Sequence, residues 1–442
     1  MTSYWCELAW LGGERAEQGV VIEVAEGRIN SLATGVATPP PDATRLEGVT
    51  IPGLANAHSH AFQRALRGRT EGGAGSFWTW REQMYRAAAA LDPDSYLELA
   101  RATFGEMALA GITAVGEFHY LHHGPGGAPY ADPNAMGSAL IEAAGEAGIR
   151  ITLLDACYLR GGIDVELDDV QRRFSDGSAD AWAERVDALS DGPTARMGAA
   201  IHSVRAVEPE AAALVAAWAA ERSRPLHAHV SEQPAENEAS LDAYGGTPTA
   251  VLGSAGALSD RFTAVHATHL ADSDFALLGG SGACCCLCPT TERDLGDGVA
   301  PARRLAEAGA RLSLGTDSNA VIDVFEEARA VELDERLASG TRGLHGAAEL
   351  LRAATEGGHA SLGWPEAGRI TTGALADLAT VGLDSPRLAG TDPAHAIESL
   401  VFAAAPSDVR HVIVGGRFVV RDGAHVGLDV AADLRAALAR VR

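Results

Sequence analysis

The stretch IPGLANAHSHAFQRAL, residues 51–66, places His58 and His60 one residue apart, directly after an apolar run. Side chains two positions apart on an extended chain point to the same side, so both imidazoles can converge on one point where a strand ends. This spacing suits a metal site, but His-x-His alone is equally consistent with two surface or hydrogen-bonded histidines. The rest of the chain has to distinguish the two interpretations.

Seven further β-like runs follow the first, separated by Ala-rich stretches with helical periodicity. The eight runs are residues 48–60, 112–120, 149–158, 195–204, 224–232, 261–270, 282–292 and 310–319. Eight alternations of strand and helix predict an α/β fold, a (β/α)8 TIM barrel, whose active face lies at the carboxyl ends of the strands. Polar residues gather late in these runs, and a simple strand-ending role explains poorly why histidine recurs there.

The two ends of the chain have a different pattern. VVIEVAEGRINSL (residues 20–32) and HVIVGGRFVVRDG (residues 411–423) are typical of short strands joined by glycine turns. We predict that residues 1–48 and 370–442 together form one small β-sandwich domain. Residues 49–369 are then the barrel domain.

Composition and charge exclude several classes of function. The net charge of −24 over 442 residues argues against nucleic acid or an anionic membrane as a partner. No run approaches the roughly 18 apolar residues of a membrane span, and the first residues lack the pattern of a signal peptide. Four of the six cysteines fall within residues 284–288, which cannot form a disulfide framework and indicates a reducing compartment. We expect a soluble, cytoplasmic protein.

The cysteine run allows two interpretations. Cys285 and Cys288 form a CxxC pair that could bind metal, but the sequence has no second pair. The apolar character of the run fits a buried strand better.

Four residues at strand ends are candidate metal ligands. His58 and His60 follow the first run, His229 lies in HAHVSE on the fifth, and Asp317 lies in GTDSN on the eighth. Catalytic zinc takes nitrogen and oxygen ligands and keeps one position open for water, whose pKa it lowers to about 7. These four side chains are predicted to hold one divalent metal ion. Iron and manganese accept the same ligands.

The order of these residues resembles the amidohydrolase superfamily of metal-dependent deaminases, over nearly the whole chain. Longer motifs are similar to the formiminoglutamate deiminase family, namely HSHAFQRAL, SFWTWREQMY, GEFHYLHH, HSVRAV, HVSEQ, VHATH and LCPTTERDLGDG. The resemblance implies hydrolysis of N-formimino-L-glutamate to N-formyl-L-glutamate and ammonia in histidine degradation. It implies a single zinc ion, because HSVR stands where two-metal members carry a bridging lysine. GTDSNAVID departs from the family's pattern after Asp317, so we assign no role to the residues that follow it.

Three residues are expected to be catalytic. Zinc hydroxide would attack the formimino carbon, and Glu232, three residues beyond His229, would shuttle a proton to the imine nitrogen. Asp317 would take a proton from the water, and His266 would hydrogen-bond the hydroxide as charge shifts. His266 is preferred to His269, which falls in the following loop and is expected to cap or hydrogen-bond.

A substrate with two carboxylates requires cations inside an acidic protein, and the planar fork of arginine suits that task. Arg81 and Arg205 are the candidates, and Trp78 and Trp80 could close over the ligand. By resemblance, the residues that contact the substrate are Gln63, Arg81, Tyr120, His202 and Arg205. The alternatives are a salt bridge with Glu82 or another acidic residue of the loop for Arg81, and a satisfied core hydroxyl for Tyr120.

Two other functions remain open. One is an aminohydrolase of the same superfamily that acts on a purine, pyrimidine or triazine ring, although paired arginines suit a dianion better than a flat ring. The other is an inactive metal-binding homologue that serves as a subunit or sensor, against which Glu232, His266 and Asp317 count. Superfamily members often form dimers, and a homodimer is the assembly that the resemblance implies.

Overall fold

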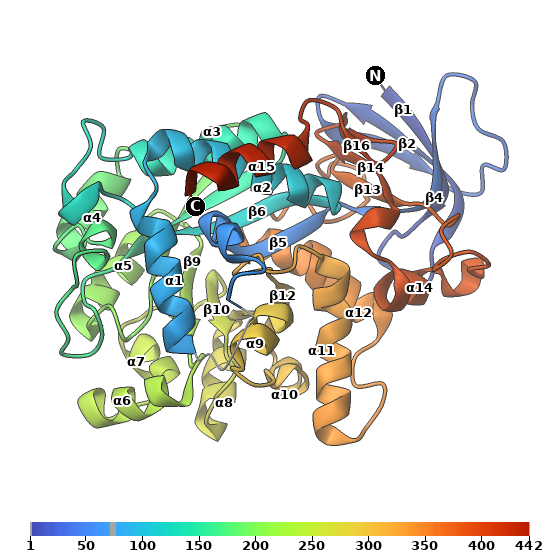
Figure 1. Ribbon diagram of the computed structural model, residues 1–442. Helices are drawn as coiled ribbons and strands as arrows, with labels where there is room; N and C mark the ends of the chain where they lie inside the picture. Colours follow the sequence, from blue (N-terminus) through green and yellow to red (C-terminus); the bar gives the residue numbers. More distant parts are fainter. Residues whose placement is uncertain (1, 71–76, 442) are drawn as a thin grey trace.

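The computed structural model describes residues 2–70 and 77–441. Its first sheet has eight strands, each paired in parallel with the next strand along the chain. Helices surround these strands, so the predicted (β/α)8 barrel is confirmed (Figure 1). The strands are β5 (Leu54–Ser59), β6 (Ile112–His119), β7 (Arg150–Cys157), β8 (Ala195–Ile201), β9 (Leu226–Val230), β10 (Phe262–His266), β11 (Cys284–Leu287) and β12 (Arg311–Leu314).

Helices link the strands on the outside of the barrel. They begin with local signals; for example, α2 has Pro93 in its first turn, and the Asp92 side chain accepts a hydrogen bond from the Ser95 N–H. The helices of this layer are α1 (Phe77–Ala89), α2 (Pro93–Leu109), α3 (Ala135–Ala147), α4 (Ala179–Val186), α5 (Pro209–Glu221), α6 (Pro234–Tyr244), α7 (Pro248–Ser254), α8 (Asp272–Ser281), α9 (Pro289–Leu295), α10 (Ala302–Glu307), α11 (Val324–Ser339), α12 (Ala347–Arg352) and α13 (Gly358–Ser361).

The barrel closes where its first and last strands meet. Ser59 and Asp317 form a parallel bridge, the Asp317 N–H donates to the His58 carbonyl at 2.9 Å, and the His60 N–H donates to the Asp317 carbonyl at 3.0 Å. Asp317 has a φ of +43°, a left-handed conformation that costs a non-glycine residue of order 1 kcal/mol. The closing contact therefore fixes three of the predicted metal ligands relative to one another.

The second sheet is built from both ends of the chain, as predicted. Its order is β16-β15-β14-β13-β4-β1-β2-β3, with β1 and β4 parallel and the other neighbours antiparallel. Figure 1 shows its N-terminal and C-terminal strands side by side at one end of the barrel. The strands are β1 (Thr2–Ala9), β2 (Glu17–Ala25), β3 (Arg28–Ala33), β4 (Thr44–Pro52), β13 (Leu378–Val381), β14 (Val409–Val414), β15 (Arg417–Arg421) and β16 (Ala424–His425).

The structure corrects two predicted strands. Residues 48–60 are not one barrel strand, because the chain leaves the terminal sheet after Pro52 and enters the barrel at Leu54. Gly53 makes this crossing possible, since a Cβ at that position would overlap the Thr113 side chain. The predicted domain boundary at residue 48 thus falls inside β4. In the seventh run, Pro289 begins helix α9, so residues 289–292 are helical.

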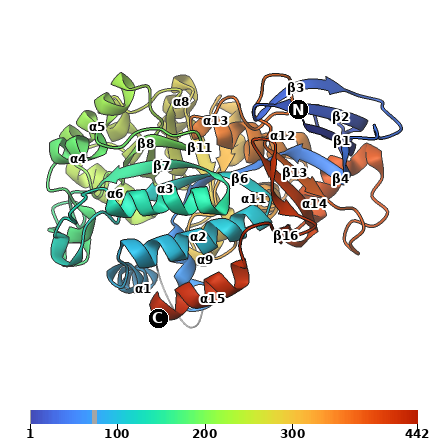
Figure 2. The ribbon, with the colours of Figure 1, turned by 90° about the horizontal axis from the view of Figure 1, so that it is seen from above.

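Two C-terminal helices complete the fold. Helix α14 (Ala396–Ala403) precedes the last strands, and α15 (Val430–Val441) returns to lie along α2 (Figure 2). Gly105 permits this approach, because a Cβ there would lie 2.9 Å from the Val430 side chain. Among the helices described, none has both the length and the apolar composition needed to cross a membrane.

Candidate active site

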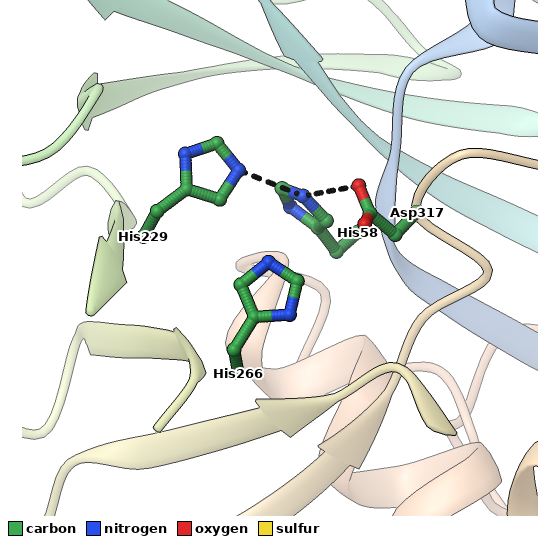
Figure 3. A group of neighbouring side chains, drawn as sticks. All are labelled: His58, His229, His266 and Asp317. Atoms are coloured by element: carbon green, nitrogen blue, oxygen red, sulfur yellow. Dashed lines mark hydrogen bonds and ion pairs between the residues drawn. The ribbon is translucent and has the colours of Figure 1, made fainter. Parts of the chain in front are cut away.

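The predicted metal ligands meet at the carboxyl ends of the barrel strands. His58 and His60 lie at the end of β5, His229 lies on β9, and Asp317 follows β12. Ligand atoms of His58, His229, His266 and Asp317 all lie within 4.8 Å of one another, and their rings and carboxylate surround one point (Figure 3). The structure therefore brings together residues that are up to 259 positions apart in sequence.

Three nitrogens and one oxygen make the closest contacts. His58 Nε2 lies 3.2 Å and His60 Nε2 lies 3.3 Å from the same oxygen, Asp317 Oδ1. His229 Nε2 lies 3.2 Å from His58 Nε2. His60, which Figure 3 does not draw, thus belongs to the same group as His58, His229 and Asp317.

The hydrogen bonds of the rings show that this donor set fits a cation. His60 Nδ1 lies 2.8 Å from the Phe118 carbonyl and His229 Nδ1 lies 2.9 Å from the His202 carbonyl. A carbonyl can only accept, so each Nδ1 carries the proton and each Nε2 presents a lone pair. These lone pairs converge with the Asp317 carboxylate, an arrangement of acceptors that a bound metal ion stabilises.

Burial keeps the three rings neutral. It lowers the pKa of His58 to about 3, and it holds the pKa of His60 below and that of His229 well below the usual value. Burial opposes ionisation of Asp317, but its hydrogen bond to His58 and the nearby rings hold its pKa well below the usual range. Three neutral imidazoles and one carboxylate are the protonation states that metal ligation requires.

His266 differs from the other three histidines. Its ring stacks on His229 with centroids 5.6 Å apart, and its Nε2 lies 3.9 Å from Glu232 Oε1. Although burial opposes the charged form, Glu232 and other carboxylates raise the pKa of His266 to about 10. His266 has a left-handed φ of +69°, which turns the chain at the end of β10. His269 lies beyond this turn, with its Nε2 2.7 Å from the Asp297 carbonyl.

The cysteine run lies beside this centre. Strand β11 carries Cys284, Cys285 and Cys286 as free, buried thiols in the barrel wall. Cys288 forms a compact group with His266 and Glu292, while Cys285 belongs to none of the candidate metal clusters in the part of the chain described. The buried-strand interpretation of the run therefore agrees with the structure.

Glu232 and Arg205 form an ion pair beside the metal ligands. Arg205 Nη2 lies 3.0 Å from Glu232 Oε2, and Arg205 Nε lies 3.9 Å from Glu236 Oε2. Although burial opposes its charge, Glu236 and Glu232 raise the pKa of Arg205. Glu236 also accepts the backbone N–H of Glu232 at 3.1 Å. The arginine therefore lies between two buried carboxylates.

A cavity of about 400 Å³ opens onto these groups. It is lined by the predicted ligands His60, His229 and Asp317, and by Glu232 and His266. All the residues predicted to contact the substrate also line it, namely Gln63, Arg81, Tyr120, His202 and Arg205. One cavity thus joins the predicted metal, proton-transfer and substrate residues.

Several of these side chains already have protein partners. Gln63 Nε2 donates to the Tyr120 hydroxyl at 3.0 Å, and that hydroxyl donates to Met84 Sδ at 3.6 Å. His202 Nδ1 lies 3.2 Å from Ser203 Oγ. The Tyr120 hydroxyl is therefore satisfied within the protein, as its alternative interpretation expected, while its ring lines the cavity.

Arg81 is held by the cavity wall. Its Nε donates to the Tyr85 hydroxyl at 2.5 Å and its Nη2 donates to the Gly161 carbonyl at 3.2 Å. Trp80 lines the cavity, whereas the Trp78 side chain lies outside the described part of the structure.

Sequence reasoning missed five residues of this site. Tyr85, Tyr158 and Glu236 line the cavity, Gln171 holds the two tyrosines, and Glu292 contacts His266 at 3.5 Å. Tyr158 directly follows β7, so its position at a strand end was the available signal. Gln171 begins a short 3-10 helix (Gln171–Phe174) between β7 and α4, where no spacing pattern marked it.

A second buried cluster is held by an arginine. Arg185 donates to Asp155 at 2.8 and 2.9 Å and to Asp176 at 2.8 and 2.9 Å, and the Trp182 indole donates to Asp155 at 3.0 Å. Against the effect of burial, Arg185 lowers the pKa of Asp155. The guanidinium neutralises the carboxylates, so this cluster, which includes His122, is a poor site for a second metal ion.

The fold and this centre define a metal-dependent hydrolase, and comparison with known proteins agrees. Residues 49–419 match the model of the Amidohydrolase family, and the chain belongs to that family. It is 39% identical to a formimidoylglutamate deiminase from Pseudomonas aeruginosa, over 96% of this chain and 94% of that protein.

Two solved structures are similar along their whole length. An amidohydrolase from Brucella melitensis is 33% identical with a TM-score of 0.92, and the match covers 100% of both chains. An atrazine chlorohydrolase from Arthrobacter aurescens, complexed with zinc, is 26% identical with a TM-score of 0.88 and full coverage of both chains. Proteins with similar folds thus carry names of different reactions.

Proposed function

We propose that the protein hydrolyses N-formimino-L-glutamate to N-formyl-L-glutamate and ammonia, as a cytoplasmic step of histidine degradation. The observation that carries the proposal is that Arg81 and Arg205 line the same cavity as the metal ligands. Two guanidinium groups suit a dicarboxylate in a chain with a net charge of −24. The similarity to a formimidoylglutamate deiminase supports the same substrate.

One zinc ion is the proposed cofactor, held by His58, His60, His229 and Asp317. When bound, it supplies a Lewis acid that lowers the pKa of a coordinated water toward neutrality. The zinc in the related atrazine chlorohydrolase supports this choice of metal.

The protein's own residues then move the protons. Water supplies the oxygen of the formyl group, and both of its hydrogens leave on ammonia. Glu232 carries one proton of the attacking water to the imine nitrogen, and Asp317 accepts the other and passes it to the same nitrogen, which leaves as ammonia when the carbon–nitrogen bond breaks. His266, 3.9 Å from Glu232 and stacked on His229, donates a hydrogen bond to the developing oxyanion.

Arg205 has two tasks in this scheme. It is paired with Glu232 at 3.0 Å and lines the cavity, so a substrate carboxylate that binds it shares the guanidinium with the proton shuttle. Substrate binding and proton transfer are therefore linked through one side chain.

Ammonia release from N-formimino-L-glutamate by the zinc-loaded protein tests the proposal. Guanine, cytosine and an uncharged formimino compound are assayed beside it. Turnover confined to the dianion is the expected result. Turnover of the ring compounds, with none of the dianion, would discard the proposed substrate.

A ring aminohydrolase is the second candidate. Tyr120, Tyr158 and Phe174 give one cavity wall an aromatic surface on which a flat ring can stack. The same assay separates the two candidates, because a neutral ring does not need Arg81 or Arg205.

A further inference from the structure

Gln171 is a buried amide whose orientation can be assigned. Its Oε1 accepts the backbone N–H of Asp168 at 3.0 Å. A backbone N–H only donates, so this atom is the oxygen and the other is Nε2. Nε2 lies 2.9 Å from both the Tyr85 and the Tyr158 hydroxyl oxygens, with the Gly161 carbonyl farther away at 3.4 Å. Its two hydrogens therefore go to the two tyrosines.

The hydroxyl oxygen of Tyr85 cannot accept a hydrogen bond from Tyr158, because it already accepts two. It receives one hydrogen bond from Gln171 Nε2 and another from Arg81 Nε at 2.5 Å, and both nitrogens only donate. Burial, followed by the adjacent Tyr158, raises the pKa of Tyr85, so the phenol keeps its proton. Tyr158 therefore cannot donate to Tyr85.

The Tyr158 proton is consequently directed elsewhere. Its oxygen already accepts from Gln171 Nε2, and within residues 2–70 and 77–441 its proton has no hydrogen-bond acceptor. Tyr158 lines the cavity, where its ring packs edge-on against His202 with centroids 4.5 Å apart. The remaining direction for this donor is into the cavity.

The surroundings of Tyr158 favour a negatively charged acceptor. Through Tyr85 and Gln171 it is connected to Arg81, and it lies close enough to Arg205 for the two to interact electrostatically. A neutral O–H donor in a cavity that two guanidinium groups also line is complementary to a carboxylate.

We propose that the Tyr158 hydroxyl determines specificity by donating a hydrogen bond to one carboxylate of the substrate, and that Gln171 is the positioning residue that orients it. The inference rests on the proposed function for the choice of a dicarboxylate. Tyr158 is then a third hydrogen-bond donor to the substrate carboxylates, beside Arg81 and Arg205. Gln171, at the start of a short 3-10 helix, sets the direction of its hydroxyl.

Binding of N-formyl-L-glutamate to the zinc-loaded, full-length protein, measured by calorimetry, tests the proposal without turnover. Tyr158→Phe should weaken binding roughly 10- to 100-fold, the usual range for a hydrogen bond to a charged group. Tyr244→Phe, on α6 outside the cavity lining, is the matched control and should bind as wild type does. Equal binding by Tyr158→Phe and wild type would overturn the proposal.

The Gln171→Glu variant tests whether Gln171 orients the Tyr158 hydroxyl, because the glutamine and glutamate side chains have nearly the same size. A carboxylate at this position accepts both tyrosine protons, so it turns the Tyr158 hydroxyl away from the cavity while the tyrosine remains. Gln171→Glu should therefore weaken binding about as much as Tyr158→Phe, and the double variant should lose no more than either single variant. Independent, multiplying losses, or unchanged binding in Gln171→Glu, would overturn the positioning role.

Two monocarboxylates exclude a merely structural effect. N-formyl-L-2-aminobutyrate lacks the side-chain carboxylate and 4-formamidobutyrate lacks the α-carboxylate. Binding of one of the two should be insensitive to Tyr158→Phe, whereas equal sensitivity of both would refute a specific carboxylate contact. If wild type binds N-formyl-L-glutamate through Tyr158 but releases no ammonia from the formimino compound, the proposed function fails and this inference stands. If wild type does not bind the dicarboxylate, the inference itself fails.

Discussion

Replacing Glu232 with glutamine isolates proton transfer from metal binding. Glutamine has nearly the same size and can still accept the hydrogen bond that Arg205 donates to Glu232 at 3.0 Å. It cannot take up and deliver a proton. Glu232 is also not among the four proposed metal ligands, so zinc content should stay at the wild-type level.

The Glu232→Gln variant is expected to lose most of its catalytic rate, as a decrease in kcat. Positioned general acid–base catalysis contributes about 100- to 10,000-fold, which corresponds to roughly 2.7–5.5 kcal/mol of the activation barrier. The KM of this variant should stay unchanged or decrease, for the following electrostatic reason. Two opposite charges 3.0 Å apart attract by about 5 kcal/mol at an effective dielectric constant near 20, before solvation costs. Removing the Glu232 charge frees Arg205 from this competitor for the substrate carboxylate.

Steady-state ammonia release and metal analysis on the same preparations give the answer. Glu238→Gln, on the exposed side of α6, removes a carboxylate from the same region and should leave both kcat and zinc content unchanged. A Glu232→Gln enzyme that retains wild-type kcat would refute the shuttle role. Loss of zinc in this variant would show that Glu232 acts on the metal centre instead.

Three further outcomes are expected. Arg205→Ala should raise the KM for N-formimino-L-glutamate roughly 10- to 100-fold in steady-state kinetics, because a charge-assisted hydrogen bond contributes about 1.5–3 kcal/mol. Arg205→Lys should restore part of this loss, and an unchanged KM in Arg205→Ala would contradict substrate binding by Arg205. Dialysis against a chelator should abolish activity and lower Tm in calorimetry until zinc is returned, since the converging acceptors lose their cation; an unchanged Tm would argue against the site. Arg185→Met should lower the free energy of unfolding in urea by about 3–5 kcal/mol, because Asp155 and Asp176 stay buried without their partner. Because the folded-state pKa of Asp155 lies below its usual 3.8, the stabilisation is complete above that pH and is lost as pH falls below it. The difference between wild type and Arg185→Met should therefore shrink as the pH falls below 3.8; a difference that stays the same over this fall in pH would refute this assignment.

The barrel was predictable because its strands are short apolar runs at regular intervals, each followed by a helical stretch. The exact strand limits were not. Pro52 and Gly53 interrupt the run of residues 48–60, and the chain changes sheets at this pair, where Thr113 leaves no room for a Cβ on Gly53. The Pro-Gly pair marks a turn, but that the two halves of the run belong to different sheets depends on tertiary contacts such as this one.

The positions of the candidate site residues were predictable where these residues lie at strand ends. His58, His60, His229 and Asp317 each end a recognisable run, so the fold itself brings them together. Gln171 begins a short 3-10 helix and Glu236 lies on the first turn of α6, where glutamine and glutamate are common for other reasons. Their roles appear only from hydrogen-bond partners that lie far away along the chain, such as Tyr85 for Gln171.

The bridge between Ser59 and Asp317 has a consequence for biosynthesis. A ribosome completes the His-x-His pair early and must add more than half of the chain before it reaches Asp317. Until then the nascent chain lacks one of the four proposed metal ligands, and the barrel strand β5 has no partner on its second edge. Binding of the metal ion is therefore expected to follow translation of β12 and Asp317. The bound ion then stabilises the closed barrel, so that only completely synthesised chains are expected to hold metal.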